Sequence, residues 1–535
     1  MGRLSAIKRC ASHAAAAVVA VAFLQQVQAS QIDVIALSGQ LIFNSNGSIS
    51  TFPFGPLLND ARQAAFFVEL TGTSGGDDDD RAVYRLDGAN LSQIVRAGQA
   101  APDGDGSFEK FYRSVLNNTG QVALWAELTG TNDGKRDSGI FRGDGSMLTA
   151  IVREGQATPD SDGSFAHFYY DIPFLNDAGQ TAFAATLVGA SAGRNAGVFH
   201  GNGVTLTQVA RAGQAAPHGN GVLATFAVSA LNDSGQTLFV SQLTDTSGGV
   251  GDNVGVFLGN GGAVTQIVRT GQAAPDGNGS FKNLAYFNPL LNNAGEAAFE
   301  ADLTDTIGGD DDNAGIFRGN GATLTQIVRR GQAVPDGNGK FESFSGGNSS
   351  LAFNEAGQVA FRSSLDTTDS DFGIFRGDGA AITQIARTGQ TAPNGDGGFV
   401  DFYSPALNDA GQVAFGAELS GENSGSGIFI FDDRRGLLPV VRTGDLLLGS
   451  VVTHALFEGS TEFNGFPGLS IGDKYSGLNA FGQVAFSFRL ADGRSGIALW
   501  TIPEPSSLAL IALAALRVKY RRSPRGNGRA ASQLV

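Results

Sequence analysis

The stretch LNDAGQVAF, residues 407–415, contains the pattern on which the fold depends. Asparagine at its first turn position, Asn408, and glycine at its fourth, Gly411, favour a type I turn followed by a left-handed residue in a G1 bulge. Apolar residues alternate with others before this turn, as at Phe402, and after it, as at Phe415. Alternation with a period of two is typical of half-buried strands. The stretch therefore predicts a β-hairpin.

The same hairpin pattern recurs along most of the 535 residues. Its first turn position is occupied by Asn59, Asn117, Asn176, Asn232, Asn292, Asn354, Asn408 and Asn479, which we call the register asparagines. Their spacings are 58, 59, 56, 60, 62, 54 and 71 residues, and chance does not produce eight copies at such a period. A fixed period of this length indicates tandem structural repeats.

A second hairpin follows the first in each repeat. Asn320-Gly321 lies between two β-rich runs, and an Asn-Gly or Asp-Gly dipeptide in that context is a strong hairpin signal. The last strand ends in an Arg-x-Gly-Gln pattern, with its arginine at Arg96, Arg153, Arg211, Arg269, Arg329 and Arg387. Each repeat thus predicts four antiparallel strands.

Eight such repeats predict an all-β fold, a β-propeller of eight four-stranded blades. Residues 35–40 match the end of a fourth strand but precede the first repeat, and the last repeat lacks its fourth strand. We expect the N-terminal strand to complete the last blade, with residues near Ile35 beside residues near Ile497, because closure removes exposed sheet edges. The alternative is a β-solenoid or an open array of small sheets.

The two ends carry targeting patterns. Residues 1–29 have a basic start, an apolar run and the small-residue site Val27-Gln28-Ala29, as in a secretory signal peptide. Pro503, Glu504 and Pro505 precede a short apolar run, residues 508–516, and a basic tail. The sequence therefore divides into a signal peptide at 1–29, the propeller at 30–502 and a sorting segment at 503–535.

Two family resemblances follow from these motifs. The end of the chain resembles the PEP-CTERM sorting signal, which implies a Gram-negative-type bacterium, an exosortase-like protease as partner, and membrane contact only through this segment. The repeats resemble the NxxGxxAF tandem-repeat family of exported proteins with various C-terminal anchors. Together they imply a location at the cell surface, in the outer envelope or in the extracellular matrix. Neither resemblance implies an activity.

The composition excludes some functions. The only cysteine, Cys10, lies in the signal peptide, so the mature chain has no disulfide. Between residues 30 and 502 the chain has 27 basic and 50 acidic residues, a net charge of −23. Such a field repels nucleic acid and attracts cations, so we expect no nucleic-acid partner.

Acidic, glycine-rich loops follow the fourth strands and suggest structural calcium, because calcium takes oxygen ligands on a flexible backbone. The candidate metal ligands are Asp103, Asp105, Asp160, Asp162, Asp276 and Asp336. The alternative is that these loops are solvated turns, and we also expect residues 77–80 and 310–312 to be solvated loop tips. The repeated arginine is expected to bind an acidic loop or a carbonyl of the neighbouring blade; the alternative is that it lines a ligand surface.

The sequence gives little support for catalysis. His167, His200, His218 and His454 stand in unrelated contexts, and no nucleophile or metalloprotease motif is present. We expect a non-enzymatic surface- or matrix-associated protein that binds a glycan or a protein, with no catalytic residue and no cofactor besides calcium. The alternative is an extracellular polysaccharide hydrolase or lyase, with carboxylates from different blades meeting at the axis. The least regular stretch, residues 446–478, is a second place where function is expected.

Overall fold

A computed structural model of the protein describes residues 32–42, 46–132, 137–168, 173–284, 289–344, 351–367, 371–393, 397–421, 425–457 and 476–502, without the side chains of 112 and 113. Val34–Leu499 forms one compact unit. The remainder, Met1–Asp33 and Trp500–Val535, falls almost entirely outside the described residues. No helix of the described part is both long and apolar enough to cross a membrane.

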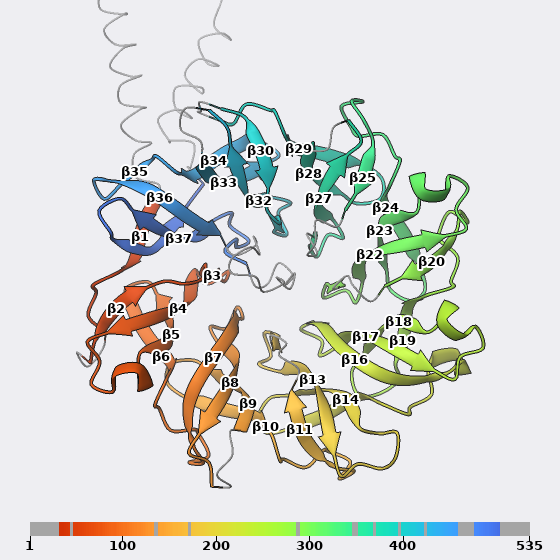
Figure 1. Ribbon diagram of the computed structural model, residues 1–535, viewed down its shortest axis with the longest axis horizontal. Coiled ribbons are helices and arrows are strands. Elements are labelled where there is room, and N and C mark those ends of the chain that lie inside the picture. The colour runs from red at the N-terminus through yellow and green to blue at the C-terminus, as the bar shows by residue number, and fades with distance from the viewer. Residues whose placement is uncertain are drawn as a thin grey trace, which may run out of the picture. The chain divides into compact units, whose positions relative to one another are not determined.

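The compact unit is a ring of eight antiparallel sheets, the predicted propeller (Figure 1). Blade 1 contains β2 (Ser48–Thr51), β3 (Leu57–Leu58), β4 (Gln63–Thr71), β5 (Arg81–Asp87) and β6 (Asn90–Arg96). Blade 2 contains β7 (Ser107–Leu116), β8 (Val122–Thr129), β9 (Asp137–Gly143) and β10 (Leu148–Arg153). Blade 3 contains β11 (Ser164–Phe168), β12 (Phe174–Leu175), β13 (Thr181–Val188), β14 (Ala196–Gly201) and β15 (Leu206–Arg211). Blade 4 contains β16 (Val222–Leu231), β17 (Thr237–Thr244), β18 (Val254–Gly259) and β19 (Thr265–Arg269).

The second half of the ring repeats this order. Blade 5 contains β20 (Ser280–Asn283), β21 (Leu290–Leu291), β22 (Ala297–Thr304), β23 (Ala314–Gly319) and β24 (Leu324–Arg329). Blade 6 contains β25 (Phe341–Ser343), β26 (Leu351–Phe353), β27 (Val359–Leu365), β28 (Phe372–Gly377) and β29 (Ile382–Arg387). Blade 7 contains β30 (Phe399–Phe402), β31 (Ala406–Leu407), β32 (Val413–Leu419), β33 (Gly425–Asp432) and β34 (Gly436–Arg442). Short 3₁₀ turns interrupt the loops at η2 (Gly76–Asp78), η3 (Pro217–Gly219), η4 (Gly249–Gly251) and η5 (Gly309–Asp311).

Blade 8 is built from both ends of the compact unit, as predicted. It contains β35 (Leu446–Leu447), β36 (Ser450–Phe457), β37 (Val484–Leu490) and β38 (Ser495–Trp500), and β1 (Ile32–Leu37) pairs beside β38. The backbone N–H of Ser38 donates to the carbonyl of Ser495 at 2.8 Å. The N-terminal strand therefore supplies the missing fourth strand, and the ring has no open edge at this point.

The hairpin turn has the conformation that its sequence predicts. In the turn at Asn408 the Gly411 N–H donates to the Asn408 carbonyl at 2.9 Å, and Gly411 has a φ of 78°. The first repeat has Arg62 in place of this glycine, and Arg62 still adopts a left-handed φ of 62°. The guanidinium of Arg62 lies 5.6 Å from the ring centroid of Phe481. The repeat geometry therefore imposes the turn even on a residue that disfavours it.

The residue three positions before the register asparagine explains why some first strands are broken. Proline occupies this position at Pro56, Pro173, Pro289 and Pro405, and the first strand there is divided into two pieces. Serine occupies it at Ser114 and Ser229, and β7 and β16 are continuous. Proline has no backbone N–H to donate to a strand ladder, whereas serine has one.

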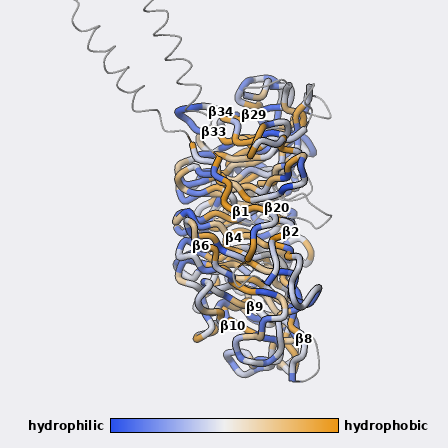
Figure 2. Tube along the Cα trace, turned by 90° about the vertical axis from the view of Figure 1, so that its left-hand side faces the viewer, coloured by the Kyte–Doolittle hydropathy of each residue, from blue (hydrophilic) through white to orange (hydrophobic). Residues whose placement is uncertain are grey.

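The core consists of phenylalanines that alternate with glycines. In blade 5 the Phe317 ring packs edge-on against Phe281 at 5.0 Å and stacks on Phe299 at 6.0 Å. Gly315, two residues before Phe317, leaves room for this ring, because a Cβ there would lie 3.0 Å from Phe317 Cζ and 2.8 Å from the Val328 carbonyl. Hydrophobic strand segments alternate with hydrophilic loops throughout the ring in the edge-on view (Figure 2). The core is therefore built from phenylalanine-rich clusters that extend across neighbouring blades.

We predict that Gly315→Ala lowers the free energy of unfolding by about 1–3 kcal/mol, because the added methyl overpacks a core without free space. Gly251→Ala is the matched control, since Gly251 has no positive φ and a methyl added there would meet nothing within 4 Å. That variant should be neutral or more stable by up to about 1 kcal/mol. Chemical denaturation measures both, and equal losses in the two variants would contradict this account of the core.

Candidate functional site

The register asparagines form a chain of hydrogen bonds around the centre of the ring. In seven of the eight repeats, Nδ2 of the asparagine donates to the backbone carbonyl of the register asparagine in the next blade, at 2.8–3.3 Å. One of these bonds runs from Asn479 back to Asn59, 420 residues away in sequence. The asparagines are 1–5% exposed, so the amides are buried as well as paired. The turn motif is therefore also the device that joins blades at the axis.

The residue after each register asparagine forms a second ring. Its backbone N–H donates to the side-chain oxygen of the corresponding residue in the next blade, at 2.8–2.9 Å. The acceptors are Asn118, Asp177, Asp233, Asn293, Glu355, Asp409 and Asp60. The eighth position is Ala480, which has no side-chain acceptor. Sequence reasoning missed this ring, although an acceptor at that position in seven repeats was a signal for it.

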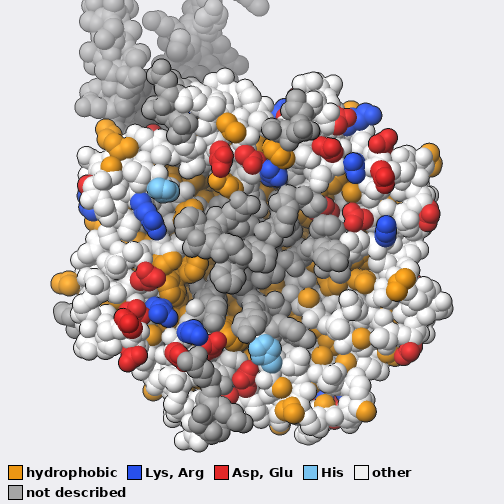
Figure 3. Space-filling model, in the orientation of Figure 1, with side chains coloured by type: hydrophobic (Ala, Val, Ile, Leu, Met, Phe, Trp, Pro, Cys, Tyr) orange, Lys and Arg blue, Asp and Glu red, His pale blue; other side chains and the backbone are white. Residues whose placement is uncertain are grey.

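The two rings surround a cavity at the axis with a volume of about 200 Å³. Five carboxylates line it: Asp60, Asp177, Asp233, Glu355 and Asp409. Seven large apolar side chains line it as well: Leu58, Phe174, Leu231, Leu290, Leu291, Phe353 and Leu478. Hydrophobic side chains also gather around the centre of the face shown in Figure 3, with charged side chains toward its rim. Among the described lining residues there is no lysine or arginine, so the cavity combines negative charge with apolar walls.

Arginines at the end of the third strand add further contacts between blades. Arg318 donates to the carbonyl of Gly357 in the next blade at 2.8 Å. Arg85, Arg142 and Arg376 bond the equivalent glycine carbonyls of their following blades. Each of these glycines belongs to a hairpin turn at the axis, so a cation from one blade fixes the turn of the next.

The repeated arginine of the fourth strand binds loops of its own blade. Arg153 contacts Asp103 at 2.7 Å and Asp137 at 3.0 Å, which lie in the loop before the first strand and at the start of the third. Arg329 contacts Asp276 at 2.8 Å, and Arg387 contacts Asp336 at 3.0 Å. The prediction that this arginine binds an acidic loop is confirmed, and its carbonyl partners belong to its own blade. We call this arrangement the rim clamp.

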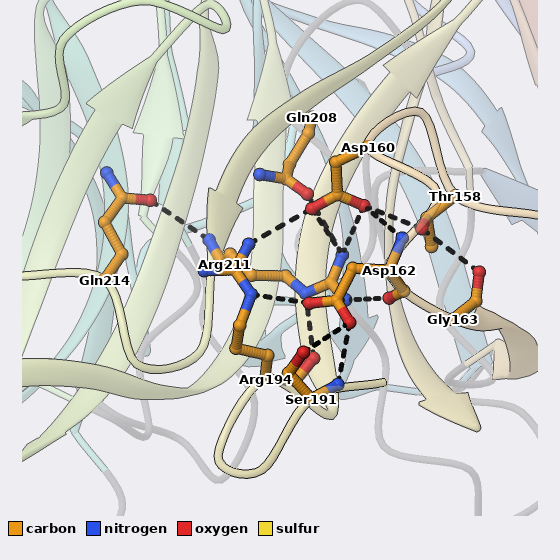
Figure 4. Close-up of polar contacts among 9 residues, drawn as sticks. All are labelled: Thr158, Asp160, Asp162, Gly163, Ser191, Arg194, Gln208, Arg211 and Gln214. Atoms are coloured by element: carbon orange, nitrogen blue, oxygen red, sulfur yellow. Dashed lines mark hydrogen bonds and ion pairs between the residues drawn. The ribbon is translucent and has the colours of Figure 1, made fainter. Parts of the chain in front are cut away.

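Blade 3 has the most extensive rim clamp (Figure 4). The side chain of Arg211 is 1% exposed and donates to the carbonyl of Arg194 at 2.8 Å and to Asp160 Oδ1 at 3.3 Å. Arg211 also bonds the backbone carbonyl of Asp162. Arg194 then contacts Asp162 at 2.7 Å and Asp160 at 3.1 Å. Two cations and two carboxylates therefore neutralise one another at this point of the rim.

The structure gives the six candidate calcium ligands specific roles in these clamps. Asp103, Asp160, Asp276 and Asp336 bind the guanidinium of their clamp arginine. Asp162 binds Arg194, and Asp105 accepts the backbone N–H of Asn132 at 2.7 Å. Within the described residues, no three His, Cys, Asp or Glu side chains lie close enough together to hold a metal ion. Calcium binding stays a prediction, and these carboxylates already serve the cations of the chain.

Two other expectations are changed or fall outside the structure. Asp79 and Asp312, in the runs predicted to be solvated tips, are half-buried and contact Arg96 at 3.2 Å and Arg329 at 3.9 Å. The expectation was wrong for them because the loop folds back onto the clamp. Pro503, Glu504 and Pro505 lie outside the described residues, as do residues 1–29 and 458–475.

A groove lies between the fourth strand of blade 1 and the second hairpin of blade 2, with a volume of about 710 Å³. The amides of Asn46, Gln93 and Gln99 line it, as do the hydroxyls of Ser92 and Ser146 and the apolar side chains of Leu91, Met147 and Leu148. Its two charged lining residues, Asp79 and Arg96, contact each other. We call this region the blade 1–2 groove, and its chemistry is uncharged hydrogen bonding beside apolar surface.

Comparison with known proteins identifies a family but no characterised relative. Residues 2–252 and 247–509 match a family of unknown function, DUF7453, and each match contains four register asparagines. No curated protein matches the chain. Among solved structures, it is similar to the β-propeller domain of the Trilobed protease from Pyrococcus furiosus, with 8% identity, a TM-score of 0.35, and 74% of this chain and 100% of that chain covered.

Two further solved structures are similar to the chain. The acylaminoacyl peptidase of Pyrococcus horikoshii has 11% identity and a TM-score of 0.37, with 75% of this chain and 53% of that chain covered. The GH74 xyloglucanase of Xanthomonas campestris has 12% identity and a TM-score of 0.34, with 76% of this chain and 55% of that chain covered. This chain therefore spans about half the length of these two enzymes, and the likeness concerns the fold.

We predict that Arg211→Ala lowers the free energy of unfolding by about 2–4 kcal/mol, because it leaves partly exposed carboxylates and a buried carbonyl without their cation. Arg211→Lys should lose less, since it keeps the charge but not the planar fork. Arg494→Ala removes a surface pair whose side chains are 37% and 41% exposed, and it should change stability little. Urea denaturation tests the set, and equal stability of Arg211→Ala and wild type would contradict a structural clamp.

Acid should weaken the rim clamps. The Thr246 hydroxyl is the largest of the contacts that hold the pKa of Asp252 below its ordinary value of 3.8, and Asn220, Gly248 and Arg269 act in the same direction. Because the folded pKa lies below the unfolded one, this stabilisation is complete above about pH 5 and is lost as the pH falls through the folded pKa. We predict a melting temperature that falls below about pH 4, and falls less steeply in Asp252→Asn. Parallel curves for the two proteins would contradict this assignment.

Proposed function

The chain belongs to DUF7453, a family of unknown function, so its function must be inferred from its own structure. We propose that it is an exported, non-enzymatic protein that binds a glycan or a protein. In this role the propeller is a rigid scaffold that holds surface grooves in fixed positions. Most of its repeated charged side chains bind one another or the backbone of a neighbouring repeat. They are therefore part of the scaffold.

The blade 1–2 groove is the observation that supports binding most directly. Its volume of about 710 Å³ lies within the range of about 300–1,000 Å³ that ligand sites usually occupy. Amide side chains line it from blade 1 and the Ser146 hydroxyl from blade 2, and Met147, which is 68% exposed, adds accessible apolar surface. Sugars present hydroxyls together with apolar ring faces, so this lining suits a neutral glycan better than a charged ligand.

The proposal places the protein at the cell surface, in the outer envelope or in the extracellular matrix of a Gram-negative-type bacterium. Its support is the signal-like segment 1–29 and the Pro503-Glu504-Pro505 motif with its apolar run and basic tail. An exosortase-like protease is the expected processing partner. In that setting an acidic ring with a glycan groove would attach to extracellular polysaccharide.

The alternative is a polysaccharide hydrolase or lyase with its site at the axis. One observation favours it, since carboxylates from different blades do meet around the axial cavity. Each of the five accepts a backbone N–H from the preceding repeat, however, which gives the carboxylates a structural role. We therefore keep the binding protein as the proposal.

A glycan array probed with residues 30–502 tests it, and we predict binding to a neutral oligosaccharide. Gln93→Ala and Met147→Ala should each weaken binding by about three- to tenfold, the effect of one lost hydrogen bond or apolar contact. Gln326→Ala and Val204→Ala are the controls, because they alter β24 and the exposed second-hairpin turn of blade 3 outside this groove. Equal weakening by all four variants would contradict the groove assignment, and release of new reducing ends from the bound glycan would favour the hydrolase.

A further inference from the structure

We infer that the blade 1–2 groove selects a sugar that carries an acetamido group, such as an N-acetylhexosamine unit of a glycan. The inference rests on the proposed function as a glycan-binding protein, and it names the class of sugar that this same groove takes. An acetamido group places a carbonyl oxygen, which only accepts hydrogen bonds, next to a methyl group. Three features of the groove match it: amides whose oxygens are already engaged, a tyrosine that fixes one of these amides, and apolar side chains in the same lining.

The backbone fixes the orientation of the Gln99 amide. Its Oε1 accepts the N–H of Arg96 at 3.2 Å, and because a backbone N–H can only donate, the oxygen of the amide must face it. The same bond recurs in four other blades, whose acceptors are Gln156, Gln214, Gln332 and Gln390. Gln99 is half-buried and lines the groove. In the described structure its NH2 group donates to no other residue, so it is left for a ligand.

Gln99 in turn orients the amide of Gln93. The Oε1 of Gln99 also accepts a hydrogen bond from Nε2 of Gln93 at 3.2 Å, so the amide nitrogen of Gln93 lies on that side and its oxygen on the other. The Tyr84 hydroxyl donates to this oxygen over a long 3.5 Å, between two residues that are directly paired across β5 and β6. One N–H of Gln93 is used in this chain of bonds. The second remains for a ligand in the groove.

Asn46 is oriented in the same way. Its Oδ1 accepts the backbone N–H of Ser74 at 2.8 Å, and its Nδ2 donates one N–H to Asp79 at 3.0 Å. All three amides that line the groove therefore have an oxygen engaged by a donor of the chain and at least one N–H left over. A surplus of N–H groups favours a ligand group that only accepts. A carbonyl is such a group, whereas a sugar hydroxyl brings a hydrogen of its own.

Tyr84 is particular to blade 1 and is a positioning residue. At the equivalent place blades 2–7 have phenylalanine, at Phe141, Phe199, Phe257, Phe317, Phe375 and Phe429. Tyr84 is 1% exposed and does not line the groove, so it affects a ligand only through Gln93. In blades 5 and 6 a phenylalanine is paired with the equivalent glutamine, and the buried Oε1 of Gln326 and of Gln384 has no hydrogen-bond partner in the described structure. The tyrosine hydroxyl supplies the donor that those two amides lack.

Apolar side chains complete the match to an acetamido group. Leu91, Met147 and Leu148 line the groove together with the amides, and Met147 is 68% exposed. A methyl group that packs against them is removed from water, which favours binding. The two charged lining residues, Asp79 and Arg96, contact each other, so the lining as a whole suits a neutral sugar.

The test is isothermal titration calorimetry of the full chain with tri-N-acetylchitotriose and with cellotriose, which differ only in the group at C2 of each sugar. We expect the acetamido trisaccharide to bind at least about tenfold more tightly. Gln93→Glu keeps the shape of the side chain but replaces its N–H donors by acceptors, and it should abolish this preference. Asn202→Asp is the matched control. It adds the same charge in the second hairpin of blade 3, where Asp144 and Asp378 are natural equivalents, and it should leave the preference unchanged.

Tyr84→Phe introduces the residue that six other blades have, so the fold is retained. It should weaken binding of the acetamido trisaccharide about threefold, because the Gln93 amide is no longer held. In the Gln93→Ala background the same change should have no further effect, since Tyr84 acts through Gln93.

Four results would each overturn the inference: equal binding of the two trisaccharides, no binding of the acetamido trisaccharide, equal losses in Gln93→Glu and Asn202→Asp, or additive losses for Tyr84→Phe and Gln93→Ala. A neutral glycan that binds on the array without a preference for acetamido groups would still support the proposed function. The inference and the proposed function therefore fail separately.

Discussion

The asparagine amide at the first turn position is the interaction on which the rest of the ring depends. Each amide satisfies its own turn by bonding the side chain four residues later, as Asn59 does with Gln63 at 2.8 Å. Seven of the eight amides also reach the carbonyl of the next blade, as Asn59 does. A buried amide with partners missing would be costly. The bond from Asn479 to Asn59 therefore links ring closure to satisfaction of the turn chemistry.

The rim obeys a different constraint. Loops far from the axis cannot rely on a packed core, since they are glycine-rich and exposed. Blades 1–6 hold them by placing one buried guanidinium between the two loops. Arg211 and Arg329 each contact side chains or carbonyls from both loops of their own blades. This explains how a strongly acidic chain remains compact: its cations are placed where carboxylates converge, and much of the remaining negative charge faces solvent or the axis.

The candidate binding regions combine repeated residues with residues that differ from one repeat to another. In the blade 1–2 groove, Gln93 occupies a position that is glutamine in four other repeats as well, whereas Met147 replaces smaller residues such as Thr205 and Ala381 in other repeats. The axial cavity owes its mixed lining to substitutions among equivalent positions, such as Ala480 for an acceptor and Phe353 for a leucine. Residues that recur in most repeats hold the ring together. Residues that vary between repeats make its grooves and its axial cavity chemically different from one another.

The sequence by itself determined the repeat, its four strands, the blade count and the closing strand, because turn chemistry and alternation are local and recur eight times. It also indicated that the clamp arginine binds carboxylates of an acidic loop. Sequence could not show which groups meet across blades: the Asp60 ring and the cavity at the axis depend on closure. The half-burial of Asp79 depends on how the loops of blade 1 pack against Arg96. Residues 420 positions apart are brought together only when the ring is complete, since the contacts between Asn479 and Asn59 and between Ala480 and Asp60 are set by the summed geometry of eight sheets.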